Sequence, residues 1–230
     1  MKILVINPNT SRSVTDKIAD VARRSVSTGT TLEFVTAAYG VPYIATRAEA
    51  VIGGRVALEI LAEREAEFDA AIIAAFGDPG LGAARELMRI PVVGLAEASL
   101  LMACPLGRSF SVVSFSSRLE PWYRECIAWH GLSNRLASIR MLDTRVADIA
   151  RVESENRALL IELATRAVEE DAAEAIILAG APLAGLASQV RDLIPVPVIE
   201  GVAASIKIAE GLVTLKPRKP VAGSFRQPAP

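Results

Sequence analysis

Four short loops of the sequence carry small, polar or glycine-rich residues before a helical pattern. They span residues 7–11, 76–80, 114–118 and 180–182. In parallel α/β sheets such loops lie at the carboxyl ends of the strands, where backbone N–H groups of helix N-termini favour carboxylate, imide or phosphate oxygens. The sequence therefore predicts a subsite for a small anionic or amide-bearing molecule. Its expected lining residues are Asn7, Asn9, Ala75, Phe76, Gly77, Ser114, Ser117, Gly180 and Ala181.

Four side chains near these loops are candidates for the base in a proton transfer. They are Asp78, Glu97, Glu200 and Cys104. Three of them also have a purely structural interpretation. Asp78 followed by Pro79 is a favourable N-cap with proline at the first helical position. After the loop at residues 7–11, Ser13 with Asp16 likewise resembles a capping box. Glu97 and Glu200 follow apolar runs, and a carboxylate near a helix start is commonly just stabilised by the helix dipole.

The single histidine and the two cysteines give weak signals. His130 lies in Trp129-His130-Gly131, a pattern typical of a helix end, and Cys126 on the same helix is expected to pack. Cys104 and Cys126 are the only cysteines, and no Cys-x-x-Cys spacing supports zinc. We therefore expect no metal, no cofactor and no disulfide framework, as in a reducing cytoplasm.

Short apolar runs alternate with helical patterns along the chain. The expected strands are residues 3–6, 32–35, 71–75, 92–95, 111–115, 138–142, 176–179 and 196–199. Most are apolar throughout, as in strands that helices cover on both faces. The order β-α-β-α predicts parallel sheets.

The chain also repeats itself. Residues 69–99 reappear as residues 174–205, so that Ala75 corresponds to Gly180, Pro91 to Pro197 and Ser99 to Ser205. A weaker similarity pairs residues 5–10 with 112–117. We therefore predict an α/β fold of two pseudo-symmetric parallel-sheet (Rossmann-like) halves with a ligand cleft between them.

The expected boundaries follow from this repeat. Residues 1–98 with 201–215 form the first half, residues 99–200 the second, and residues 216–230 a basic, proline-rich C-terminal arm. A net charge of −1 does not favour nucleic acid or an anionic membrane as a partner, and no long apolar run predicts a membrane span. The expected partner is a small-molecule substrate, and a homo-oligomer stays open.

At these loops the sequence resembles the aspartate/glutamate/hydantoin racemase superfamily, and the hydantoin and allantoin racemases most closely. The resemblance rests on residues 6–10, 74–81, 91–98, 177–181 and 197–204. It implies two pseudo-symmetric domains with the substrate between them, and a cofactor-independent racemase or isomerase. Family members typically remove an α-proton with one cysteine and return a proton from the opposite face with another.

The resemblance places these two cysteines at Ala75 and Gly180, which cannot transfer a proton. Three functions therefore stay open. The first is a racemase or isomerase acting at the α-carbon of a hydantoin-like, ureide or amino-acid-derived molecule without the two-cysteine pair. The second is a decarboxylase-type relative, and the third a non-catalytic protein that binds or senses a small molecule.

Overall fold

The protein is described here by a computed structural model covering residues 1–142, 149 and 151–226. Two four-stranded parallel sheets form its framework, which confirms the predicted fold class. The first sheet has the order β2-β1-β3-β4, with β1 Lys2–Asn7, β2 Thr31–Thr36, β3 Ala70–Ile73 and β4 Val92–Gly94. The second has the order β6-β5-β7-β8, with β5 Phe110–Ser114, β6 Leu136–Met141, β7 Ile176–Leu178 and β8 Val198–Ile199.

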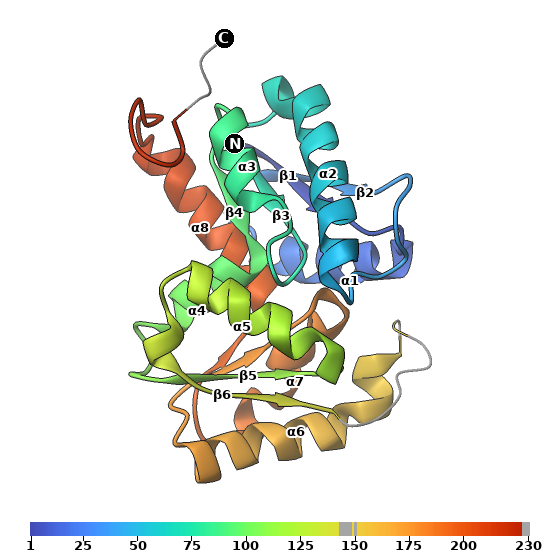
Figure 1. Cartoon of the computed structure of the whole chain (residues 1–230), viewed down its shortest axis with the longest axis vertical. Helices are drawn as coiled ribbons and strands as arrows, with labels where there is room; N and C mark the ends of the chain where they lie inside the picture. Colours follow the sequence, from blue (N-terminus) through green and yellow to red (C-terminus); the bar gives the residue numbers. More distant parts are fainter. Residues whose placement is uncertain (143–148, 150, 227–230) are drawn as a thin grey trace.

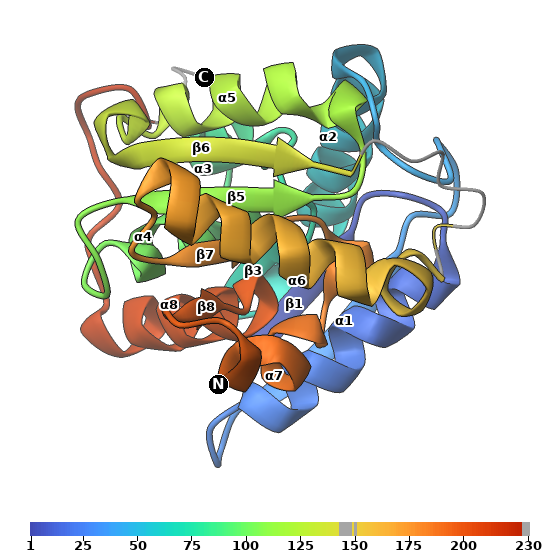
Figure 2. The same ribbon diagram turned by 90° about the horizontal axis from the view of Figure 1, so that it is seen from below.

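Helices connect the strands and cover the sheets (Figure 1). They are α1 Arg12–Ser25, α2 Arg47–Arg64, α3 Leu81–Leu87, α4 Leu95–Ala103, α5 Glu120–Trp129, α6 Val152–Asp171, α7 Leu186–Val190 and α8 Gly201–Leu215. Five 3₁₀ turns accompany them, at Glu65–Glu67, Ser117–Leu119, Ser133–Arg135, Ala181–Leu183 and Arg191–Leu193. In the second half, α6 packs on β5 and β6, and it crosses in front of this sheet in Figure 2.

The strand registers show that the two halves are copies of one unit. In the first sheet Val5 lies beside Ile72, which pairs with Val93. In the second sheet Val112 lies beside Ile177, which pairs with Ile199. These two sets are the residues that the repeat matches, so the internal repeat corresponds to a repeated structure.

In the first sheet, β1, β3 and β4 are buried on both faces, which explains their continuous apolar sequences, whereas the edge strand β2 is partly buried. Leu4 and Ile6 point into a cluster with α2 and α3, whereas Ile3 and Val5 point into the larger core with α1. All four side chains are fully buried or nearly so.

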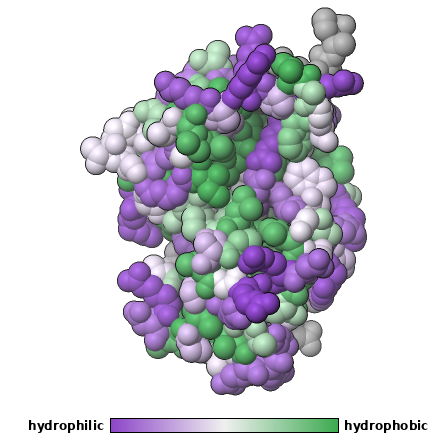
Figure 3. All heavy atoms as spheres, turned by 90° about the vertical axis from the view of Figure 1, so that its left-hand side faces the viewer, coloured by the Kyte–Doolittle hydropathy of each residue, from purple (hydrophilic) through white to green (hydrophobic). Residues whose placement is uncertain are grey.

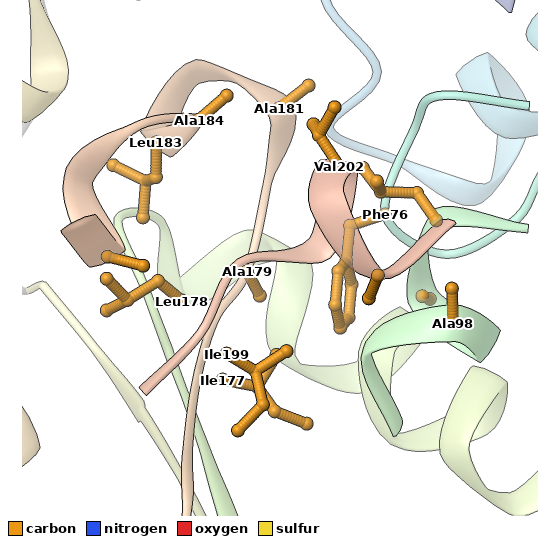
Figure 4. Close-up of a cluster of buried hydrophobic side chains, with 14 of the residues drawn as sticks. Phe76, Ala98, Ile177, Leu178, Ala179, Ala181, Leu183, Ala184, Ile199 and Val202 are labelled. Carbon is orange, nitrogen blue, oxygen red and sulfur yellow. The ribbon is translucent and has the colours of Figure 1, made fainter. Parts of the chain in front are cut away.

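The larger core is continuous across both halves. It contains apolar side chains from β1, β5, β7 and α8. Figure 4 shows Phe76, from the loop after β3, beside Val202 of α8, with Ile177 and Ile199 of the second sheet nearby. Helix α8 follows the last strand of the second sheet but packs on α1, α4 and β3. The halves therefore share one apolar core.

The face that carries α8 mixes hydrophilic and hydrophobic side chains, with a cluster of hydrophobic ones in its upper half (Figure 3). After α8, the chain folds back over α3. Lys219 donates a hydrogen bond to the Glu86 carbonyl, and the Phe225 ring lies against Arg85 and Trp129. Among the described residues, no helix is long and apolar enough to cross a membrane.

A buried carboxylate fastens α8 to the end of α1. Glu210 accepts hydrogen bonds from the backbone N–H and the hydroxyl of Ser27, both at 2.8 Å, and from Lys207 at 2.9 Å. Burial opposes ionisation of this carboxyl, but these donors outweigh it and lower its pKa to about 2.

We predict that Glu210→Gln lowers the free energy of unfolding by about 2–3 kcal/mol at pH 7. Because the folded-state pKa is depressed, the stabilisation is present above the unfolded value near 4.5 and is lost as pH falls toward 2. Urea unfolding of both proteins should show their difference shrinking between pH 4.5 and pH 3. Glu63→Gln, at an exposed position on α2, is the control. An equal difference at pH 7 and pH 3 would contradict the assignment.

Candidate active site

The loop after β1 is an ordered turn built by two asparagines. Asn7 and Asn9 are buried, and the side-chain oxygen Oδ1 of Asn7 accepts from the Asn9 backbone N–H at 3.2 Å. Asn9 accepts from the Ser11 N–H at 2.9 Å, and the Asn7 amide lies 3.0 Å from the Thr15 hydroxyl. The two side chains therefore fix the entry into α1. That helix begins at Arg12 after Ser11, which makes no side-chain cap, so the expected capping box of Ser13 and Asp16 does not form.

Gly180, at the end of β7, has a backbone conformation that suits glycine. Its φ is +109°, a value that residues with a side chain rarely adopt. A Cβ built there would lie 2.8 Å from Cε1 of Phe115 and 3.6 Å from the Tyr123 hydroxyl. The space that a side chain at position 180 needs is thus taken by the Phe115 ring.

The Tyr123 hydroxyl stands close to Gly180, and the Tyr43 hydroxyl contacts it. Tyr123 hydrogen-bonds with Ser114 and with Tyr43, and Ser114 in turn donates to the Ala179 carbonyl at 2.8 Å. Burial raises the pKa of both tyrosines, so each stays protonated at neutral pH. The Phe76 ring lies 4.7 Å from that of Tyr123, which brings the loop after β3 against α5.

Asp78 caps a helix, but not the helix that its sequence position predicts. Helix α3 begins at Leu81 after Gly80. The Asp78 carboxylate instead accepts from the backbone N–H groups of Ala96 and Glu97, each at 2.8 Å, in the first turn of α4. The φ of +49° at Asp78 turns its side chain across to α4 rather than along its own chain. The expectation of a local N-cap with Pro79 was therefore wrong.

Glu200 caps α8 in the corresponding place of the second half. Its two oxygens accept from Val202 N–H at 3.3 Å and from Gly185 N–H at 2.9 Å. Burial raises the pKa of this carboxyl, although the two backbone N–H groups oppose that effect. Glu200 also lines a cavity of about 10 Å³, room for about one water molecule, together with Gly180, Phe76 and Ser99. Glu200 is thus the one of the four candidate bases that lines the same cavity as Gly180.

The two capping carboxylates come from different positions of the repeat. Gly94 corresponds to Glu200, and a Cβ at Gly94 would overlap the Asp78 carboxylate. In the first half, Asp78 in the loop after β3 supplies the capping carboxylate, and the residue at the start of α4 is Gly94. In the second half the helix start supplies it, and Leu183 takes the place of Asp78 in the loop.

The other two candidate bases are engaged elsewhere. Glu97 forms an ion pair with Arg85, with 2.8 Å between Oε1 and Nη1. Cys104 lies at the C-terminal end of α4, where its thiol contacts the Leu100 carbonyl at 3.3 Å. Ser117 starts an exposed 3₁₀ turn, and Ala181 lines the small cavity beside Gly180.

Two residues with weak sequence signals meet at Asp78. His130 ends α5, as expected, and its Nε2 lies 3.1 Å from Asp78 Oδ2. Cys126, one turn earlier, is buried beside them, and burial together with the charges of Asp78 and Glu97 raises its thiol pKa. Gly77 lies here too, against Trp122, on a cavity of about 350 Å³ that is separate from the one at Gly180.

Sequence reasoning missed Tyr43, Phe115 as a space-filling ring, and Tyr123. Tyr43 precedes α2 in an irregular segment, and Tyr123 reads as one apolar position of an amphipathic helix. Nothing in their spacing marks them. Their approach to Gly180 depends on how α5 packs against the loops of the first half.

Comparison with known proteins decides the family. The model of the Asp/Glu/Hydantoin racemase family matches residues 3–209. The chain belongs to this family. It is 40% identical to a hydantoin racemase of Paenarthrobacter aurescens over 99% of this chain and 98% of that protein. A second hydantoin racemase, from Pseudomonas sp. strain NS671, is 35% identical over 99% and 92% of the two chains.

A solved structure confirms the fold at full length. The allantoin racemase from Klebsiella pneumoniae superposes with a TM-score of 0.92 at 36% identity, covering 99% of this chain and 94% of that one. The expected resemblance and the racemase or isomerase class of enzyme are thereby confirmed. Alanine and glycine nonetheless occupy the two positions where the resemblance places cysteines.

We predict that Gly180→Cys destabilises the fold by about 1–3 kcal/mol, because both φ and the Phe115 ring oppose a side chain there. Adding Phe115→Leu should recover part of this loss in a double-mutant cycle. Gly131→Cys is the matched control, since Gly131 has a φ of +72° with nothing within 4 Å of its Cβ position. Equal costs at 131 and 180, with no coupling to Phe115, would show that the ring does not fill this space.

Proposed function

We propose that this protein is a racemase or isomerase that acts at the α-carbon of a hydantoin-like, ureide or amino-acid-derived small molecule without a pair of catalytic thiols. Support for the substrate class comes from the full-length similarity to hydantoin and allantoin racemases. Support for a mechanism other than two-cysteine proton transfer comes from Ala75 and Gly180, which carry no ionisable group at the positions where the resemblance places the cysteines. Neither cysteine of the chain replaces them: the Cys104 thiol hydrogen-bonds to the Leu100 carbonyl, and Cys126 is buried with a raised thiol pKa.

In this proposal Glu200 is the group that removes the α-proton. A hydrogen next to a carbonyl is weakly acidic, so the site needs a base and donors that stabilise the enolate. The single observation that carries the role is that Glu200, with its raised pKa, lines the same cavity as Gly180 and Phe76. The protonated Tyr123 hydroxyl is a donor of the kind that an enolate oxygen needs.

The test is deuterium exchange. The protein in D₂O should incorporate deuterium at the α-carbon of an L-5-monosubstituted hydantoin, followed by NMR. Glu200→Gln should slow exchange by about 10²–10⁴-fold. The rate of the parent protein should rise with pH and level off once Glu200 is ionised, and burial places that rise above the ordinary glutamate pKa of 4.5.

Two controls separate this role from stability and from thiol chemistry. Glu210→Gln removes another carboxylate of α8 far from Gly180 and should leave exchange per folded molecule within about threefold. A chain carrying Cys104→Ala and Cys126→Ala should keep exchange. Exchange lost in the cysteine-free chain would overturn the non-thiol mechanism. No exchange by the parent protein across a panel of hydantoins would favour the binding or sensing function.

A second prediction concerns the loop after β1. Asn9→Asp keeps an oxygen that accepts from Asn7 and Ser11, so the fold should persist. The added negative charge should weaken binding of an anionic or imide ligand by about tenfold or more. Calorimetric titration with a hydantoin that the parent protein binds is the measurement. Unchanged affinity would show that the subsite lies elsewhere.

A further inference from the structure

We propose that Asp78, Cys126 and His130 form a binding site for one borderline divalent transition-metal ion, with Zn²⁺ as the ion that suits these ligands best. The site lies between the loop after β3 and α5. It is separate from the cavity beside Gly180 and does not depend on the proposed function. The sequence shows only part of it, because Cys126 and His130 are four positions apart on one helix, whereas Asp78 lies 48 positions before Cys126.

The three donor atoms already lie close together. The carboxylate oxygen, the thiol sulfur and the imidazole nitrogen are all within 4.8 Å of one another. Two ligands about 2.1 Å from a tetrahedral zinc ion lie about 3.4 Å apart, and a nitrogen and a sulfur about 3.6 Å apart. The 3.1 Å between His130 Nε2 and Asp78 Oδ2 is close to the first value, so a small movement of the Cys126 side chain completes the set.

The donors are buried, so the site is built rather than a chance surface cluster. The side chains of Asp78 and His130 are only 2% and 6% exposed, and Cys126 is buried. Carboxylate, thiolate and imidazole together form a mixed O, S, N set that suits zinc more than magnesium or calcium.

A second carboxylate, that of Glu97, faces the other ring nitrogen of His130, as is usual for histidines that bind metals. His130 Nδ1 lies 3.8 Å from Glu97 Oε1, and Arg85 holds Glu97 in place. With Nε2 bound to the ion, the neutral ring carries its hydrogen on Nδ1, the side that faces Glu97.

The cavity of about 350 Å³ gives the ion an entry and room for a fourth ligand. Asp78 and Cys126 line it, with Gly77, Gly80, Trp122 and Trp129. Three protein ligands with one open position is the arrangement of zinc sites that bind water or a small molecule.

Metal binding is compatible with the helix cap. Each oxygen of Asp78 has two lone pairs, and the two backbone N–H groups of α4 use one on each. On binding, the Cys126 thiol releases its proton to solvent and its sulfur bonds to the ion. His130 gives up its Nε2 hydrogen bond to Asp78, the neutral ring moves its hydrogen to Nδ1 by exchange with solvent, and Nε2 bonds to the ion with no change of oxidation state.

The test uses the full-length chain, stripped of metal and without a histidine tag. Co²⁺ is the probe, because a cobalt–thiolate bond gives a near-ultraviolet charge-transfer band. Both tryptophans of the chain line this cavity, so their fluorescence reports on it directly. We expect the band and the quenching to saturate at one ion per chain, and Zn²⁺ to displace Co²⁺.

Variants assign the ligands. Cys126→Ser and His130→Gln should each weaken Zn²⁺ binding by about tenfold or more and abolish or shift the cobalt band. Cys104→Ser, at the other cysteine, should change it by less than about threefold. Near-ultraviolet circular dichroism checks that each variant is folded. Because Asp78 also caps α4, the assignment rests on the other two ligands.

Several outcomes would overturn the site. They are no saturable Co²⁺ binding below millimolar concentration, a cobalt spectrum without a thiolate band, or binding that survives Cys126→Ser and His130→Gln. Loss of the cobalt band in Cys104→Ser would show that the metal binds at Cys104, at the C-terminal end of α4, and not at Cys126.

Discussion

Two buried carboxylates hold the N-termini of the two helices that follow the last strand of each sheet. Asp78 accepts two backbone N–H groups from the first turn of α4, whereas Glu200 accepts one from α8 and one from Gly185 before α7, where helix dipoles favour negative charge. Without them, four N–H groups in a largely apolar centre would lack their acceptors, so the loops around Ala75 and Gly180 depend on these bonds.

The same requirement explains how the two halves have diverged without losing symmetry. A capping carboxylate is needed at each helix start, but it can come from the helix or from the neighbouring loop. In the second half it comes from the helix and leaves Glu200 beside Gly180. In the first half it comes from the loop and places Asp78 against α5 and His130. One repeated backbone therefore carries two chemically different pockets.

The sequence predicts the framework of this protein well. The eight strands of the described residues lie where short runs were expected. Burial of both faces accounts for the continuous aliphatic sequences of the inner strands, whereas the edge strands β2 and β6 are only partly buried. The repeat identifies the symmetry, because equivalent strands pair in the same register. The site is predicted less well. The partner of Asp78 lies in α4 rather than α3, and Tyr123 and His130 reach their neighbours through the packing of α5, which no local pattern encodes.

The ring of Phe115 also constrains the order in which this chain can change. A cysteine at position 180 meets that ring and an unfavourable φ, whereas a smaller residue at 115 alone leaves a void beside Tyr43. Each first step costs stability, and only the pair makes room for a thiol. A thiol at position 180 thus requires two coordinated substitutions, at 115 and at 180. Any path to a thiol at this position passes through a less stable intermediate, so the packing around Phe115 favours the glycine at position 180.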